Sequence, residues 1–504
     1  MVSIERISRK KEIFVFGINL LVLLAVYGRL LGEHLSPDFF AVHINGASEL
    51  PHHIRNGRIV YGIVLCIVQG LGLSVTTYAS GYTFLFMCIS AFCVMRISMV
   101  LCRAVGQNGF REILICAWAL LIGLINISMM EWYFFLECML MYSLSLLFAS
   151  EGALVFSRRE WSLCKRAAVS FAAMCVSINC YQACLSWYIT LALICILATT
   201  EFKPNRNAVV EGVAAMAIGG SSAVLNQLIV RFASTFKFIG TPGRQASFSY
   251  KDFIGNAIKS IPIQRDFLRN GFSLLPTYFL FAAFCAGVIL SLLAGYMRNQ
   301  GKAWMKQAAW VLSVLCICYT FVYIPHFAAN HMNVAPRSIV GLFLVLSMCF
   351  VLAILMGTKW IRVLSIACVA GILTVSYVHI SQTIDDHLLT SQRDMNEAEK
   401  IVSAIDAHEQ AGGELIEEVC VVQDTMPNYY YSDIQKCIMD INLRQMHIEW
   451  EQVNIIMALS GRTFEHVFAS KGESDSIVQG RNWDEFVPEE QLVFEGNRLY
   501  IITY

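Results

Sequence analysis

Twelve apolar segments, separated by short polar stretches, follow one another from the N-terminal part of the chain to about His379. They span residues 13–31, 59–79, 82–102, 112–130, 132–150, 167–181, 183–200, 208–230, 274–296, 304–325, 337–357 and 360–380. A helix of about 20 apolar residues crosses the hydrocarbon core of a bilayer and satisfies its own backbone hydrogen bonds there. The sequence therefore predicts a mainly α, polytopic helical membrane protein.

The composition agrees with this class. Of the 504 residues, 57% are apolar and only 15% are charged, whereas about 25% charged residues are usual in a soluble domain. The formal net charge is +0, and no basic face is concentrated enough to neutralise a phosphate backbone, so nucleic acid is not expected as a partner. Most of the 18 cysteines lie in the apolar segments and act as small hydrophobic residues. Cys420 and Cys437, in the polar C-terminal region, form either a disulfide or two free thiols.

Basic residues near the ends of the apolar segments predict the orientation. Cytoplasmic loops carry an excess of Lys and Arg. By this rule the cytoplasmic parts contain Arg6, Arg9, Lys10 and Lys11, then Lys203 and Arg206, then Arg298, Lys302 and Lys306, and finally Lys359 and Arg362. The first segment is then a retained span, and the loops 231–273 and 326–336 and the C-terminal region are extracytoplasmic.

A cytoplasmic start and an external end require an odd number of spans, so we expect about 11 transmembrane helices. Two explanations for the surplus segment stay open. Segments 167–181 and 183–200 form one helix, or a segment nearer the N-terminus is re-entrant.

The composition changes after residue 380, where acids, amides and turn residues become frequent. A helix is predicted from Arg393, a strand in EEVCVVQD, a helix ending at Gly461 and a terminal hairpin in QLVFEGNRLYIITY. We therefore predict two domains, a transmembrane domain over 1–380 and a small extracytoplasmic α/β domain over 381–504.

Polar loops supply most of the candidate functional residues. The first external loop, 32–58, is either a catalytic loop or a solvated connector. Its candidate residues are Asp38, His43, Glu49, His52, His53, Arg55 and Arg58. The external loop 231–273 has seven basic residues against two acids, and either holds an anionic lipid headgroup or is simply solvated. Loop 326–336 leads to Arg337, which either binds a phosphate or anchors the span at the interface.

Ionisable residues at membrane depth are costly and are functional or paired. Arg96, Glu131, Glu137 and Glu211 have such positions. Glu131 either faces a cavity or pairs with a structural arginine such as Arg96. His326 and His331, five residues apart in a loop, do not make a metal site, and no metal is expected.

GxSxG, HExxH, P-loop and paired CxxC motifs are absent from the sequence, which argues against the familiar hydrolases and nucleotide-driven pumps. The chain offers carboxylates, cationic donors and a lipid-facing site. Glycosyl transfer from a polyprenyl-phosphate sugar uses these groups, because arginines stabilise the departing phosphate while an acid deprotonates the acceptor hydroxyl.

Three short motifs carry a family resemblance over most of the chain. The polar loop after the first span contains PD and ends in NGR, the stretch INCYQACLSWY contains a YQ element, and WDEFVPEEQLVFEGNRLY lies at the end. The chain resembles the bacterial membrane glucosyltransferases that include the serotype-converting O-antigen glucosyltransferases, and through them the GT-C class. The tail is similar to those of relatives in Gram-positive bacteria.

The resemblance implies an essential acid in the first external loop, which is Asp38 first and Glu49 second. Many relatives have a paired DD, but here Phe39 follows Asp38 and Leu50 follows Glu49, so both acids stay candidates. The candidate substrate-binding residues are His52, Arg55, Arg58, Glu131, Tyr181, Gln182 and Arg337.

We therefore expect a cell-membrane glycosyltransferase that moves a hexose, glucose in the first instance, from a polyprenyl-phosphate donor to a cell-surface glycan. The donor and the membrane lipids are its expected partners, and no separate cofactor is expected. Two alternatives remain: a transporter or flippase of lipid-linked sugars, and a non-catalytic membrane scaffold. An enzyme needs one particular acid for turnover, whereas a flippase tolerates its loss and a scaffold tolerates loss of the whole loop charge.

Overall fold

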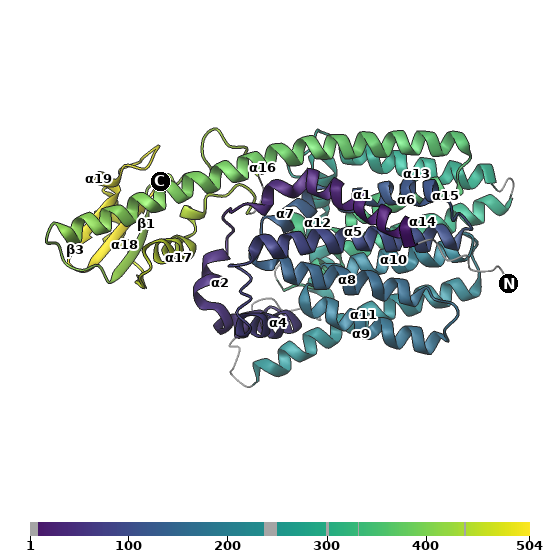
Figure 1. Cartoon of the computed structure of the whole chain (residues 1–504), viewed down its shortest axis with the longest axis horizontal. Helices are drawn as coiled ribbons and strands as arrows, with labels where there is room; N and C mark the ends of the chain where they lie inside the picture. Colours follow the sequence, from purple (N-terminus) through teal and green to yellow (C-terminus); the bar gives the residue numbers. More distant parts are fainter. Residues whose placement is uncertain (1–8, 236–248, 299–301, 331, 438–439) are drawn as a thin grey trace. The chain divides into compact units, whose positions relative to one another are not determined.

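The computed structural model describes residues 9–235, 249–298, 302–330, 332–437 and 440–504 (Figure 1). Within these ranges the chain forms two compact units. The helical unit comprises the chain up to Leu31, Ala47–Tyr133 and Cys138–Ser381. The second unit comprises Gly32–Gly46, Phe134–Glu137 and Gln382–Tyr504, so a part of the first loop belongs to it.

Helices make up the helical unit almost entirely (Figure 1). Its α-helices are α1 Arg9–Tyr27, α3 Leu50–Arg55, α4 Ile59–Gly70, α5 Ala79–Ala104, α6 Phe110–Leu120, α7 Ile127–Tyr133, α8 Met139–Phe156, α9 Leu163–Cys180, α10 Cys184–Thr199, α11 Arg206–Ser234, α12 Tyr250–Asn270, α13 Phe279–Arg298, α14 Lys302–Phe327 and α15 Gly341–Met356. Short 3-10 helices are η1 Gly28–Leu31, η3 Leu121–Gly123 and η5 Pro336–Ser338, while η2 Gly46–Glu49 and η4 Leu136–Cys138 each contain residues of both units. Helix α16, Lys359–Gln410, begins in this unit and continues into the second.

Two helices that are apolar all round form the centre of the helical unit. All 16 residues of α15 are buried, and so are 15 of the 16 residues of α10. Helix α10 packs on α8, α11, α14 and α15, while α15 also packs on α6 and α13. A helix without a polar face is stable only when neighbouring helices surround it, and this explains why α10 and α15 lie inside the bundle.

Each of the twelve predicted apolar segments contains a helix, but the predicted count of about 11 spans is not confirmed. Among the described residues, eight helices are long and apolar enough to cross a membrane, and a ninth span results if a bent pair is one span. Helices α4, α10 and α15 are apolar but shorter, with 12, 16 and 16 residues. The predicted segments therefore differ in the length of their helices more than in their hydropathy.

Two details bear on the surplus segment. Helix α9 ends at Cys180, Tyr181 is extended, and α10 begins at Cys184, so the idea that 167–181 and 183–200 form one helix is wrong. Predicted segment 112–130 is instead bent by 73° between η3 and α7. Asn126 causes a new helix start there, since its side-chain oxygen accepts from the Met129 amide at 2.8 Å.

The second unit contains a small four-stranded sheet beside the last part of α16. Its strands are β1 Glu418–Gln423, β2 Glu465–Val467, β3 Leu492–Glu495 and β4 Arg498–Thr503, in the order β2-β1-β4-β3. Strand β1 is parallel to β2 and β4, and β3 and β4 form an antiparallel hairpin. The helices are α2 Phe39–Asn45, η6 Gln445–His447, α17 Glu449–Ser460, α18 Lys471–Val478 and α19 Pro488–Gln491. The predicted strand, the hairpin and the helix that ends at Gly461 (φ 65°) are confirmed.

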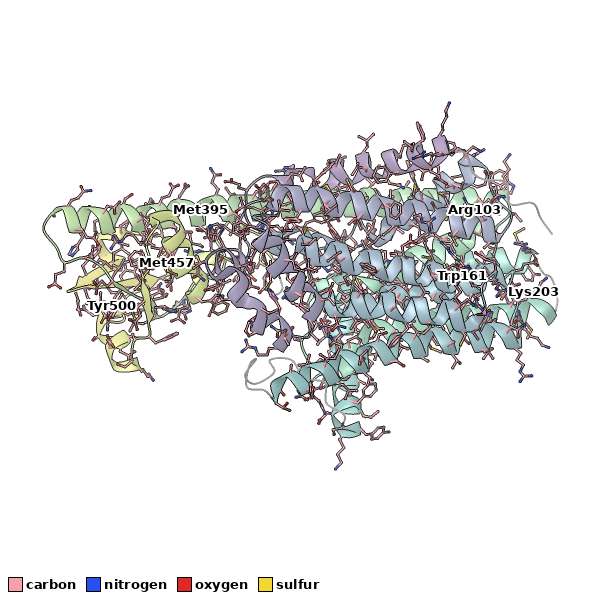
Figure 2. The ribbon with its side chains drawn as sticks, turned by 60° about the horizontal axis from the view of Figure 1, so that its bottom comes forward. Arg103, Trp161, Lys203, Met395, Met457 and Tyr500 are labelled. Carbon is pink, nitrogen blue, oxygen red and sulfur yellow. The ribbon has the colours of Figure 1, made fainter. Side chains whose placement is uncertain are left out.

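Alternate residues of β1 and β4 face two separate apolar clusters. Val419 and Leu499 lie in a cluster with α16 and α17, which Met395 and Met457 complete (Figure 2). Cys420 and Tyr500 lie in the other cluster, with part of α18. The alternation follows from the period of two in a strand. Cys420 and Cys437 are both free thiols in the described structure, which decides between the two predicted states.

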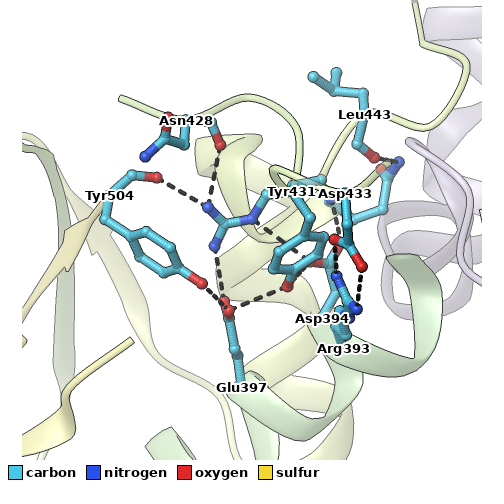
Figure 3. Close-up of polar contacts among 10 residues, drawn as sticks. Arg393, Asp394, Glu397, Asn428, Tyr431, Asp433, Leu443 and Tyr504 are labelled. Atoms are coloured by element: carbon cyan, nitrogen blue, oxygen red, sulfur yellow. Dashed lines mark hydrogen bonds and ion pairs between the residues drawn. The ribbon is translucent and has the colours of Figure 1, made fainter. Parts of the chain in front are cut away.

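A buried arginine organises the polar interior of the second unit (Figure 3). Arg444 donates to Glu397 at 2.9 Å and to the carbonyl oxygen of Tyr504 at 2.9 Å, and its Nε lies 3.9 Å from Asp394. Its guanidinium lies over the rings of Tyr431 and Tyr504, at 4.6 and 4.0 Å. Arg444 is therefore the counter-ion of two acids on α16.

Replacing Arg444 with methionine is expected to destabilise the second unit by about 3–5 kcal/mol, because two buried acids lose their counter-ion. Hydrogen exchange of the β1 and β4 amides in the purified protein measures this effect. Arg393→Met is the matched control, since Arg393 pairs with the largely exposed Asp433 and its loss should change exchange little. Equal protection in the two variants would contradict the role of Arg444.

Candidate functional site

The turn Asn56–Gly57–Arg58 lies between α3 and α4 and is held by two amide side chains. Gln182 donates from Nε2 to the Asn56 carbonyl at 3.0 Å, and Asn226 of α11 donates from Nδ2 to the Gly57 carbonyl at 2.7 Å. Gly57 has φ 75°, and a Cβ there would lie 2.6 Å from Gln182 Nε2. Glycine is therefore required both by the backbone conformation and by the close approach of Gln182.

Arg58 extends from this turn over an aromatic ring. Its guanidinium carbon lies 5.7 Å from the ring centroid of Tyr181, a cation–π distance. Tyr181 lies at the break between α9 and α10. Gln182 lies in the same break, so one interruption of the helices positions both residues. Burial, assisted by the charge of Arg58, lowers the pKa of the nearby His53 to about 3. His53 is therefore neutral at ordinary pH and adds no second positive charge beside Arg58.

A second arginine, Arg337 in η5, is bound to Glu131 of α7. Both the backbone amide and Nη1 of Arg337 donate to the Glu131 carboxylate. The exposed fractions of the two side chains are 17% for Arg337 and 1% for Glu131. The prediction that Glu131 pairs with an arginine is therefore confirmed, but Arg96 is not that arginine, because it pairs with Glu151 at 3.0 Å. The partner of Glu131 comes from a loop more than 200 residues away in the sequence.

Three aromatic rings connect the two arginines. Trp132 stacks on Tyr142 with centroids 4.3 Å apart and meets Tyr181 edge-on at 5.4 Å. Trp132 Nε1 also donates to the Arg337 carbonyl at 2.8 Å. We name Arg58, Trp132, Tyr142, Tyr181 and Arg337 the arginine–aromatic cluster.

The arginine–aromatic cluster brings together residues that the sequence analysis singled out separately. Arg58 and Tyr181 are members, Gln182 positions the Arg58 turn, and Glu131 holds the other member, Arg337. The NGR turn and the YQ element, 126 residues apart between Asn56 and Gln182, are thus one structural feature.

The other first-loop candidates of the helical unit lie on or beside α3. Glu49, half-buried, is the N-cap residue of α3, and its side chain makes no capping bond within the described chain. His52 is exposed, and its ring nitrogens lie 3.2 Å from Arg55 Nη2 and 2.9 Å from Asn56 Nδ2. His52 and Arg55 therefore contact each other and the start of the Arg58 turn.

Asp38 belongs to the second unit. It is the exposed N-cap residue of α2. Three contacts tie down the residues before it: His34 to His387 at 3.0 Å between ring nitrogens, the Leu35 amide to Ser391 Oγ at 3.2 Å, and Ser36 Oγ to Glu137 Oε2 at 2.5 Å. The Asp38 carboxylate therefore extends from an anchored segment and not from a loose loop.

Three further features considered from the sequence do not belong to the arginine–aromatic cluster. Glu211 binds Arg166 at 2.5 Å and Arg159 at 3.0 Å, which makes it part of a structural ion-pair network. Much of loop 231–273 is helix α12; Lys237 and Arg244 lie outside the described residues, as do His331 and Arg6. The described chain contains no group of three or more His, Cys, Asp or Glu side chains that could hold a metal.

Four residues that the structure makes prominent were not predicted from the sequence: Trp132, Tyr142, Asn226 and Glu451. Trp132 directly follows Glu131, and Asn226 begins an amide pair, Asn226–Gln227, in an otherwise apolar stretch, so both had a local signal. Tyr142 and Glu451 had none, because an aromatic residue in an apolar run and an acid in a polar domain are ordinary.

The apolar helical bundle and its two arginines around buried aromatic rings define a polytopic protein with a site suited to an anionic group. A family model described as Glucosyl transferase GtrII matches residues 34–356, well over half of the chain. The chain belongs to this GtrII glucosyl transferase family, which confirms the resemblance. No curated protein and no solved structure gave a significant match. The matched range contains every candidate site residue named from the sequence and ends before α16.

Proposed function

We propose that this glucosyltransferase takes a hexose, glucose in the first instance, from a polyprenyl-phosphate donor and transfers it to a cell-surface glycan on the external face of the membrane. Family membership supports the transfer of glucose. The observation that supports a phosphate-linked donor is the arginine–aromatic cluster, in which the Arg58 guanidinium lies over Tyr181 and Trp132 binds the backbone of Arg337.

The arginines suit the chemistry of the leaving group. In the transfer, the acceptor hydroxyl oxygen forms a bond to C1 of the hexose while the bond from C1 to the phosphate oxygen breaks, and the electron pair stays on the phosphate. Guanidinium groups of Arg58 and Arg337 bind phosphate through paired N–H donors and stabilise its additional charge. The surrounding rings are buried, and such an environment strengthens this electrostatic effect.

The neighbours of the two arginines then have supporting roles. Glu131 fixes the orientation of Arg337, and Tyr181 and Gln182 fix the orientation of Arg58 and of its turn. His52 and Arg55 contribute polar groups beside the same turn. Binding energy from such fixed groups is available in the transition state without further reorganisation.

A carboxylate in the first loop completes the proposal as the general base. Asp38 is the first candidate because it is exposed on an anchored segment, and Glu49 is the second. The base accepts the proton of the acceptor hydroxyl as its oxygen attacks C1. A transporter or flippase of lipid-linked sugars would use the same phosphate ligands but would need no such base.

The proposed orientation places the basic end of the helical unit in the cytoplasm and the second unit outside. Arg103, Trp161 and Lys203 lie at one end of the helical unit (Figure 2). At this end Arg158 and Lys165 both lie over the Trp161 ring, at 5.4 and 4.3 Å. Such a concentration of basic residues is typical of a cytoplasmic surface.

Asp38→Asn keeps the size of the side chain but removes the base, so the rate of glucosyl transfer is expected to fall by about 100-fold or more. Transfer is measured from a radiolabelled polyprenyl-phosphate glucose to the cell-surface glycan, with protein amount checked by immunoblot. Full activity in Asp38→Asn together with a loss in Glu49→Gln would assign the role to Glu49. Full activity in both variants would contradict base catalysis and favour the transporter.

Arg58→Lys and Arg337→Lys keep the charge but lose the planar pair of donors, so both are expected to slow transfer from the lipid donor in reconstituted protein by about 10-fold or more. Arg265→Lys is the control, because Arg265 lies on α12 with its side chain 76% exposed. Wild-type rates in both cluster variants would show that the donor phosphate is held elsewhere.

A reporter fused after Tyr504 is expected to behave as extracytoplasmic, as the distribution of basic residues indicates. Paired enzymatic reporters that are active on opposite sides of the membrane measure this. A cytoplasmic signal would reverse the orientation of the second unit and rule out an external base on the same unit.

A further inference from the structure

We propose that Glu451 of α17 is a positioning residue for the transfer reaction, because it caps helix α2 in place of Asp38 and so leaves the Asp38 carboxylate available for chemistry. This inference rests on the proposed function, in which Asp38 is the general base. It concerns a residue outside the family match, which ends at residue 356.

The first amides of a helix have no partner within the helix. An Asp at the N-cap ordinarily accepts from the amide of the second or third helical residue, here Phe40 or Ala41. Asp38 is the N-cap residue of α2, but its side chain makes no capping bond in the described structure. Glu451 Oε1 instead accepts from the Phe40 amide at 2.9 Å. Glu451 thus takes a bond that Asp38 would otherwise make.

The surroundings of Glu451 give no other reason for an acid at this position. Glu451 is fully buried, and α17 packs directly against α2. Burial raises the pKa of Glu451 well above its usual range, and the nearby acids Asp38 and Glu137 raise it further. A buried acid among other acids is unfavourable for stability unless hydrogen bonding compensates, and the bond that the described structure gives Glu451 is the one from the Phe40 amide of α2.

The segment around Asp38 is also held by apolar contacts on both sides. Leu35 and Phe40 pack in the same cluster as Val453 and Ile456 of α17. Asp38 lies between these two anchors, so the core of the second unit fixes where its carboxylate can reach. The capping bond of Glu451 then fixes the direction of the helix that begins there.

Four variants test the inference: Glu451→Leu, Glu451→Gln, Glu451→Asp and, as a control on the same helix, Glu449→Gln. Leucine removes the acceptor, and aspartate keeps the carboxyl group but shortens the side chain. Glutamine keeps the acceptor oxygen at the same reach. Reconstituted protein is assayed for kcat, for KM of polyprenyl-phosphate glucose, and for the dependence of kcat on pH.

In Glu451→Leu, Asp38 is expected to turn to the vacated amide, and kcat should fall by about 10- to 100-fold with KM of the donor unchanged. The acidic limb of the kcat profile should move to lower pH, because amide hydrogen bonds stabilise an ionised carboxylate. Glu451→Asp should also lose kcat, whereas Glu451→Gln and Glu449→Gln should stay within about 3-fold of wild type. A role in stability alone would lower the amount of folded protein without moving the pH limb.

Wild-type kcat and an unmoved pH limb in folded Glu451→Leu would overturn the inference. Where the leucine variant does not fold, equal kcat in Glu451→Asp and Glu451→Gln would overturn it. Full activity in Asp38→Asn with a loss in Glu49→Gln would also overturn it, because the base would then be Glu49. Absence of transfer from the lipid donor by the wild-type protein, or full activity in both Asp38→Asn and Glu49→Gln, would instead overturn the proposed function.

Discussion

The need to neutralise a buried carboxylate determines the arrangement around the candidate site. Glu131 is 1% exposed inside a bundle that consists of apolar helices, and an isolated ionised acid there would cost several kcal/mol. Arg337 meets this need with its backbone amide and its guanidinium, and Trp132 binds the Arg337 carbonyl. These bonds fix η5 on α7. The positions of the aromatic rings beside Trp132 depend on this attachment, and Tyr181 is one of these rings. Because Arg58 lies over Tyr181, its position depends on the attachment as well.

Hydropathy predicted the helical class and the places of the twelve helices, because the solvation of an apolar run depends on local sequence alone. It failed on the number of spans, since burial of α10 and α15 inside the bundle permits apolar helices that are shorter than a full crossing. It also failed to predict that segment 112–130 bends, because the capping bond of Asn126 is a matter of side-chain geometry.

The candidate residues of the site were predicted better than their contacts. Arg58, Tyr181, Gln182, Glu131 and Arg337 were each singled out by residue type and by position relative to an apolar segment. Their pairing depends on the packing of helices distant in sequence, so periodicity could not predict that Glu131 binds Arg337 and not Arg96. The link between Asp38 and Glu451 could not be predicted from the sequence, because neither residue lies in a pattern that indicates a partner.

The contacts of the segment that carries Asp38 have a consequence for the order in which the protein is made. The Leu35 amide binds a side chain 356 residues later in the chain, and the Phe40 amide binds one 411 residues later. At a synthesis rate of about 5–20 residues per second, the ribosome needs roughly 20–80 s to supply the second of these partners. A seven-residue helix such as α2 is not stable by itself in the meantime. Asp38 therefore acquires its final position only after the chain has been synthesised as far as Glu451, and a product that ends before Glu451 lacks this contact.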